Sequence, residues 1–155
     1  MKLAKISLSV MAALVLLSLA VQAEVKVEMK AEKVSMQDGK EVMSPAKQAA
    51  PGDIVQYTAV YKNTDKSPVK QVFATVPIPA GTEYVSGTAV PAGATASTDG
   101  TNFSAIPLKR MVKNGEGKLV EQEVPISEYR ALRWSIGDLA GGESRTVSAR
   151  VKIRK

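Results

Sequence analysis

Apolar and polar residues alternate one by one along several stretches of this 155-residue sequence. The clearest stretch is 147–153, where Val147, Ala149, Val151 and Ile153 alternate with polar side chains. Successive side chains of a β-strand point to opposite faces, so this pattern predicts a strand with one buried face. The same pattern predicts strands at 25–34, 54–61 and 69–78.

The predicted N-terminal strand, 25–34, has the most regular charge pattern. Its expected buried face carries Val25, Val27, Met29 and Ala31. The opposite face carries the charged residues Lys26, Glu28, Lys30 and Glu32. This strand fits two roles: it pairs locally as the first strand of the domain, or it adds to the sheet of a neighbouring subunit.

Turn-forming residues separate the predicted strands at intervals of about 8–12 residues, as in antiparallel sandwiches. They are Pro51-Gly52-Asp53, Pro79-Ala80-Gly81, Asp99-Gly100 and Ala140-Gly141-Gly142. Asn114-Gly115 predicts the tip of a hairpin. The best helical candidate after the N-terminus, Ile126 to Arg130, is no more than one turn. We therefore predict an all-β chain that forms an antiparallel β-sandwich of about seven or eight strands. Residues 91–101, which are poor in large apolar side chains, are expected to form an exposed loop.

The N-terminus has the features of an export signal. Lys2 and Lys5 precede an apolar run over 8–19, and Val21-Gln22-Ala23 is a small-x-small cleavage site. The sequence therefore predicts a signal peptide at 1–23, cleavage between Ala23 and Glu24, and one domain at 24–155. An uncleaved N-terminal anchor is the alternative, although the run is short for a membrane span. After cleavage we expect no stable membrane span and a periplasmic or extracellular protein, soluble or peripherally attached to the envelope.

The chain contains no cysteine and no histidine, which excludes disulfides, thiolate metal sites and the Ser-His-Asp triad. Ser44 and Lys47 have the S-x-x-K spacing of penicillin-recognising enzymes, but the prolines around them favour an extended segment. Glu121 and Glu123 share one strand face without a sign of a sugar-sized cleft. We predict a protein that is not an enzyme and has no cofactor. A calcium site built from two loops stays open, with these isolated candidates: Asp38, Asp53, Asp65, Asp99 and Asp138.

Basic residues gather in the C-terminal strand. Removal of two leader lysines leaves 19 basic and 15 acidic residues, a net charge of +4. An exported basic surface would meet lipid head groups or wall polymers, and no interleaved aromatics favour nucleic acid. Solubility and protection of a sheet edge are the alternative explanation. The candidate contacts to an anionic surface are Arg145, Arg150, Lys152, Arg154 and Lys155.

Three aromatic residues are candidates for surface platforms that stack on a ligand. Trp134 lies between Leu132 and Ile136 at strand spacing, which predicts a place in the core. Tyr84 and Tyr129 are less constrained by their neighbours, so the sequence leaves an exposed position open for both.

An ordered series of short motifs resembles the conserved repeat domain of bacterial envelope proteins, a family of unknown function. The motifs are Pro51-Gly52-Asp53, Val55, Tyr57-Thr58, Asn63, Ile78-Pro79-Ala80-Gly81-Thr82, Tyr84-Val85-Ser86-Gly87, Asp99-Gly100, Trp134-Ser135-Ile136-Gly137-Asp138-Leu139, Gly142-Glu143 and Val147. The resemblance covers about 46–153 and implies an immunoglobulin-like β-sandwich in a surface or secreted protein, with no catalytic residues to carry over. The chain departs from the family in its single copy, its hairpin at Asn114-Gly115 and its added strand at 25–34.

These observations favour an exported, non-enzymatic structural or interaction module of the bacterial cell envelope. Its partner would be a protein or a cell-surface polymer, contacted through sheet edges and loops. The alternative is a subunit of a surface assembly that polymerises by β-strand addition through the N-terminal strand. Self-association of the chain stays open in both cases.

The leader prediction is tested by the mass of the exported protein. Expressed in a bacterium, the chain is expected to begin at Glu24. Ala23→Leu places a large side chain at the cleavage site and is expected to leave the precursor uncleaved, whereas Ala13→Leu keeps the run apolar and is processed normally. An exported wild-type protein that still carries Met1 would contradict the prediction.

Overall fold

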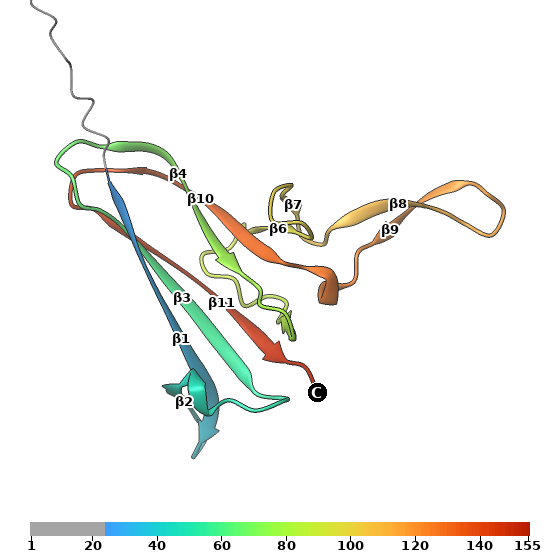
Figure 1. Ribbon diagram of the computed structural model, residues 1–155, viewed down its shortest axis with the longest axis horizontal. Coiled ribbons are helices and arrows are strands. Elements are labelled where there is room, and N and C mark those ends of the chain that lie inside the picture. The colour runs from blue at the N-terminus through green and yellow to red at the C-terminus, as the bar shows by residue number, and fades with distance from the viewer. Residues whose placement is uncertain (1–23) are drawn as a thin grey trace, which may run out of the picture.

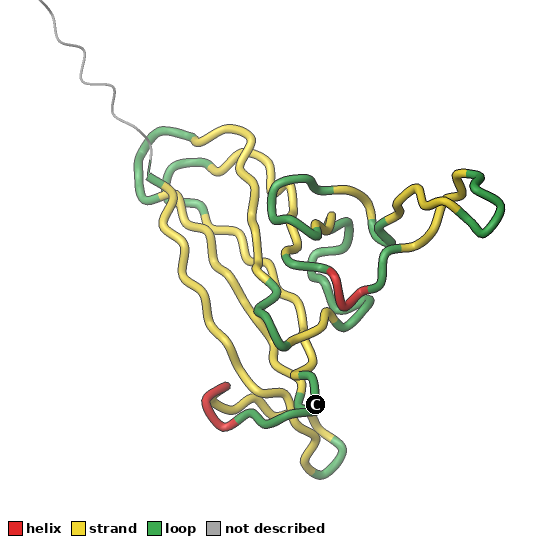
Figure 2. Tube along the Cα trace, turned by 45° about the vertical axis from the view of Figure 1, so that its right-hand side comes forward, coloured by secondary structure: helices red, strands yellow, loops and turns green. Residues whose placement is uncertain are grey.

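The computed structural model describes residues 24–155. The predicted signal peptide, 1–23, and the Ala23 side of its cleavage site lie outside the described residues and stay predictions. The described part is built from β-strands and two short 3₁₀ turns (Figures 1 and 2). The elements are β1 (Val25–Gln37), β2 (Lys40–Pro45), η1 (Ala46–Gln48), β3 (Ile54–Asn63), β4 (Val69–Pro77), β5 (Thr82–Tyr84), β6 (Thr95–Ser97), β7 (Ser104–Ala105), β8 (Lys109–Lys113), β9 (Leu119–Glu123), η2 (Ile126–Glu128), β10 (Ala131–Leu139) and β11 (Ser144–Ile153).

The strands form two packed antiparallel sheets and a separate hairpin. Sheet A has the order β2-β1-β3-β11-β5, and sheet B has the order β4-β10-β6-β7. Strands β8 and β9 pair only with each other and project from the sandwich (Figure 1); we call them the arm. The predicted all-β class and antiparallel sandwich are confirmed. The strand count exceeds seven or eight because β2, β7 and the arm add to the strands of the sandwich.

One apolar core joins the two sheets. The alternation predicted for 54–61, 69–78 and 147–153 is observed, since one face of each strand is buried. The core side chains of these strands and of β10 include Val55, Ala59, Tyr61, Val72, Ala74, Val76, Leu132, Trp134, Ile136, Val147, Ala149 and Val151. Trp134 is 2% exposed, and its indole nitrogen donates to the carbonyl oxygen of Pro91 at 2.7 Å. The prediction of a core tryptophan is confirmed.

The expectation of an exposed loop at 91–101 is confirmed only in part, and the exposure left open for Tyr84 and Tyr129 is not observed. Tyr84 and Tyr129 are buried, and their rings stack with centroids 6.4 Å apart. The Tyr129 hydroxyl accepts a hydrogen bond from the backbone N–H of Leu108 at 2.8 Å, so the ring has both an apolar contact and a polar partner. Within 91–101, strand β6 buries Ala96 and Ser97 completely. Their small side chains allow close packing against β10, whereas 91–93 and 98–101 are exposed, as expected of a loop.

The buried face predicted for 25–34 is only partly buried. Val25 and Ala31 pack against the core, but Val27 and Met29 are 47% and 45% exposed. The strand also continues to Gln37 and turns back at Asp38-Gly39 into β2, a hairpin that the alternation did not predict. Both turn residues have positive φ, which suits an Asp-Gly pair in a two-residue hairpin loop.

Polar side chains tie the sheets together where the chain crosses between them. The Tyr61 hydroxyl on β3 accepts from the N–H of Thr75 on β4 at 2.9 Å and donates to its carbonyl at 3.1 Å. Asn63 is fully buried at the end of β3 and accepts from the N–H of Asp65 at 3.0 Å. Its amide nitrogen donates to the carbonyls of Ser67, Leu139 and Ala140 at 2.8, 3.1 and 3.2 Å.

Asn63→Ala is expected to lower the free energy of unfolding by about 2–4 kcal/mol, because it leaves several inward-facing carbonyls without a donor. Asn63→Asp keeps the shape but replaces the donor with an oxygen, so it is expected to destabilise the fold at least as much. Urea unfolding followed by tryptophan fluorescence measures both changes. A loss below about 0.5 kcal/mol for both variants would show that the amide is dispensable.

Candidate functional site

The five basic residues singled out in the C-terminal strand lie on or just after β11. This strand lies inside sheet A, paired with β3 on one side and with the edge strand β5 on the other. Val147, Ala149 and Val151 point into the core, so Arg150 and Lys152 point to the outer face of sheet A. The five cations divide into two groups with different surroundings.

Arg150 is held by internal partners. Its guanidinium makes two hydrogen bonds to the Glu41 carboxylate on β2, at 2.7 and 2.8 Å, and a third to the Gln56 side chain at 3.0 Å. The pair joins β11 to β2 although β3 and β1 lie between them in the sheet. Hydrogen bonding from Arg150 lowers the pKa of Glu41, and the same contact raises the pKa of Arg150.

Arg145 also has an internal partner, because its guanidinium contacts the Glu143 carboxylate at 2.7 and 2.8 Å. The same carboxylate accepts from the backbone N–H of Ala140 at 2.8 Å, which closes the turn between β10 and β11. The Ala140 N–H and then Arg145 lower the pKa of Glu143. Arg145 and Arg150 therefore have structural partners within the chain.

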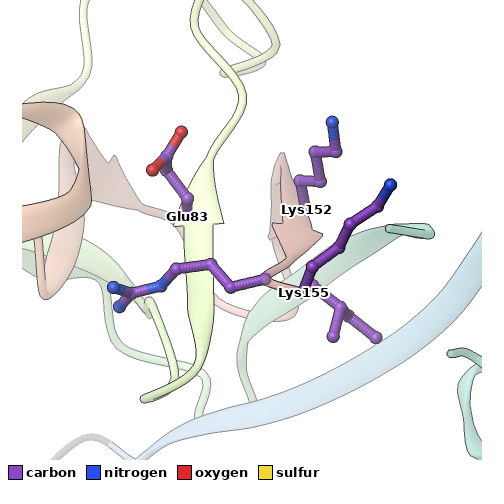
Figure 3. Close-up of a pocket in the computed structure, with 5 residues that line it drawn as sticks. Glu83, Lys152 and Lys155 are labelled. Atoms are coloured by element: carbon purple, nitrogen blue, oxygen red, sulfur yellow. The ribbon is translucent and has the colours of Figure 1, made fainter. Parts of the chain in front are cut away.

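The other three cations gather around an open hollow of about 220 Å³ at the end of β11. We call it the basic hollow; it is lined by Glu83, Lys152, Ile153, Arg154 and Lys155. Lys152 is directly opposite Glu83 in the β11–β5 register, but their charged groups diverge (Figure 3). Among the described residues, none of the three cations forms an ion pair with a side-chain carboxylate. With Glu83, the side chains around the hollow carry a net charge of +2.

This geometry suits an anionic group on an extended ligand. The hollow is open, and the ammonium groups of Lys152 and Lys155 extend toward the same side of it (Figure 3). Ammonium and guanidinium groups together offer many hydrogen-bond donors and no acceptor, which matches phosphate, sulfate or carboxylate. The shallow shape does not enclose a small molecule.

The other candidates for chemistry stay apart in the structure. Ser44 lies in β2 and Lys47 in η1. Glu121 and Glu123 are exposed on β9, and Glu121 pairs with Lys109 at 2.8 Å. The five aspartates occupy separate turns or strand ends, and residues 24–155 contain no group of three acidic side chains arranged to hold a metal ion.

Asp99 shows how such a carboxylate is used internally. It accepts hydrogen bonds from the Asn102 side chain, from the N–H groups of Asn102 and Thr101, and from the Ser97 hydroxyl, all at 2.7–2.8 Å. These donors hold its pKa far below the usual range. The carboxylate therefore organises the loop after β6 and stays ionised at any physiological pH.

Two surface features were missed by the sequence reasoning. Arg133 on the outer face of sheet B lies 3.6 Å from the ring centre of Phe103 and 5.8 Å from that of Phe73. The arm exposes Met111, Leu119 and Val120, which are 59%, 62% and 39% exposed. The Asn114-Gly115 turn did predict this hairpin, but nothing in the sequence showed that it leaves the sandwich.

The segment 24–155 includes no helix with the length and apolar character needed to cross a membrane. No family model, no curated protein and no solved structure matches the chain. The resemblance to the envelope repeat domain therefore stays a prediction that rests on the motifs alone.

Glu41→Gln is expected to release β2 from β11 at neutral pH, seen as faster amide exchange in 40–45 than in the wild type. Because the folded pKa of Glu41 is lowered, its stabilising effect is present above the ordinary value of 4.5 and is lost as the pH falls through the lowered value. The difference in melting temperature between the two proteins should thus shrink from pH 7 to about pH 3. A difference that is constant over this range would contradict the ion-pair explanation.

Proposed function

We propose that this protein is an exported, non-enzymatic interaction module of the bacterial cell envelope that contacts a phosphate-bearing polymer or head group through the basic hollow. The observation that carries the proposal is that Lys152, Arg154 and Lys155 line one open hollow and have no ion-pair carboxylate partner among 24–155. The export signal predicted at 1–23 supports the location. Outside the cytoplasm, anionic lipids and wall polymers are the abundant partners for such a surface.

A non-enzymatic role is supported by the residue types in the chain. Histidine and cysteine are absent from the sequence, so the usual base at neutral pH and the most reactive nucleophile are missing. Every carboxylate with a resolved pKa shift has its pKa lowered by hydrogen bonds; these are Glu28, Glu41, Asp53, Asp99, Asp138 and Glu143. A lowered pKa suits an ion-pair partner and disfavours a general acid.

The triple variant Lys152→Gln, Arg154→Gln, Lys155→Gln is expected to weaken binding to vesicles containing phosphatidylglycerol by about 100-fold, at about 1 kcal/mol per cation near an anionic surface. The wild-type affinity should fall steeply with salt. The matched control is Lys62→Gln, Lys66→Gln, Lys113→Gln, which makes the same charge change at exposed sites at or beyond the other end of β3 and on the arm. Cosedimentation measures all three proteins.

Soluble polyphosphate in the same assay separates a polymer from a lipid surface as the source of the phosphate groups. Competition by polyphosphate shows that the phosphate chemistry suffices, whereas binding to vesicles alone shows that the bilayer surface is required. Equal loss in both triple variants, or binding to neutral phosphatidylcholine, would overturn the proposed site.

A second candidate function is supported by a different observation. The alternative of a subunit that assembles by strand addition involves β1, which pairs with its own β3 from Val25 to Val34. On its other edge, β2 covers β1 only from Glu32 to Gln37. The strand therefore pairs within its own domain, but the backbone edge of 25–31 is open to an added strand. This favours β1 as the acceptor of a strand rather than as a strand that is donated.

A further inference from the structure

The first half of β1 carries a free backbone edge. The carbonyl of Glu24 accepts from the N–H of Thr64 at 3.0 Å, so the even-numbered residues of β1 bond toward β3. The N–H and C=O groups of Val25, Val27 and Met29 therefore point the other way. Within 24–155, no strand pairs with them there, since β2 begins its pairing at Glu32.

This edge also has an uncovered apolar face. Sheet B packs against β3 and β11, and β1 lies beyond them at the margin of sheet A (Figure 1). Val27 and Met29 face the side of the sandwich core but stay about half exposed. An added strand at this edge would satisfy the backbone groups and also cover these two side chains.

We propose that the partner at this edge is the β1 strand of a second copy of this chain, paired antiparallel about a two-fold axis with Val27 opposite Val27. The free groups of Val25, Val27 and Met29 then meet their counterparts, giving about six backbone hydrogen bonds in the usual antiparallel pattern. Val25 of each copy is opposite Met29 of the other. The apolar margins of both copies lie on the same face and cover each other.

The charges on the opposite face select this register. With Val27 on the axis, Lys26 of each copy is opposite Glu28 of the other, and Glu24 is opposite Lys30. Opposite charges directly across an antiparallel pair stabilise it, and like charges destabilise it. The alternation Glu24, Lys26, Glu28, Lys30 is thus complementary to itself when one strand is reversed.

The neighbouring registers are worse. Sliding the second strand by two residues moves the two-fold axis from Val27 to Glu28. Glu28 is then opposite Glu28, and Lys26 is opposite Lys30. Sliding the strand by two more residues restores the pairing of opposite charges. The second strand would then extend to the position opposite Glu32, which Pro45 of β2 already occupies. A two-fold pair also uses both free edges, so the assembly closes at two copies. The proposed pairing of two β1 strands specifies the partner in the second candidate function, and it does not depend on the basic hollow.

Light scattering over a concentration series tests the self-association. The exported protein is expected to shift from monomer to dimer between about 5 and about 500 µM, as for an interface at the small end of specific complexes. Val27→Pro removes an N–H that points to the free edge, so it should leave the fold intact and abolish the dimer. Its melting temperature checks that the fold is kept.

Charge reversal tests the register. Glu28→Lys places Lys26 opposite a lysine twice in the dimer and is expected to weaken dimerisation about tenfold. The double variant Lys26→Glu, Glu28→Lys swaps the charges of the intrachain pair at 3.0 Å and restores the interchain pairs, so its dimerisation should return to within about threefold of wild type. Glu123→Lys, the same change on the exposed strand β9, is the matched control and should have no effect.

Each outcome decides one claim. A monomer at every concentration would overturn the pairing together with the second candidate function, but not the proposal for the basic hollow. Species that keep growing with concentration would support an open assembly and overturn the closed pair. A dimer that survives Val27→Pro would place the interface elsewhere, and a double variant as weak as Glu28→Lys would overturn the register.

Discussion

The unequal width of the two sheets is the constraint from which the other features of this molecule follow. Sheet B covers β3 and β11, and the core between them is continuous. Sheet A continues beyond that core through β1 and β2, where Val27 and Met29 find no opposing sheet. The outermost strand β2 is short and bonds only the second half of β1, and the Arg150–Glu41 pair also ties it to β11. The same shortness leaves the other half of β1 open.

A sandwich without cysteine must hold its two sheets by packing and by buried polar contacts. Here two such groups, Asn63 and the Tyr61 hydroxyl, lie where the chain passes from one sheet to the other, and among the described residues no buried side-chain polar atom lacks a partner. Asn63 joins the turn after β3 to the turn after β10, and the Tyr61 hydroxyl bridges β3 to β4. A buried polar group costs little free energy when all its hydrogen bonds are made and much more when one partner is lost. These contacts therefore favour the arrangement in which these particular turns lie together.

Local alternation was enough to predict the strands whose faces are covered, as in 147–153, and Asn114-Gly115 was enough to predict a hairpin. The errors arose where burial depends on distant segments. Tyr129 is buried because its ring packs against Tyr84, far away in sequence, and its hydroxyl accepts from the N–H of Leu108. Val27 is exposed because sheet B ends before it reaches β1. The sequence also could not show which cations have carboxylate partners. The Arg150–Glu41 contact forms only because the β1–β2 hairpin brings β2 to a position two strands away from β11.

The basic hollow and the proposed pairing of two β1 strands both involve sheet A. Lys152 and Glu83 lie on its outer face, opposite the core, and so do Lys26 and Glu28 of β1. A two-fold axis perpendicular to the sheet keeps the outer faces of both copies on the same side. The pair would therefore present two basic hollows to one flat anionic surface, with both copies of sheet B on the other side. Two weak sites held in one assembly gain affinity because the second contact becomes intramolecular. An open hollow with three cations binds an anionic surface by itself, and joining the β1 edges of two copies would strengthen that binding.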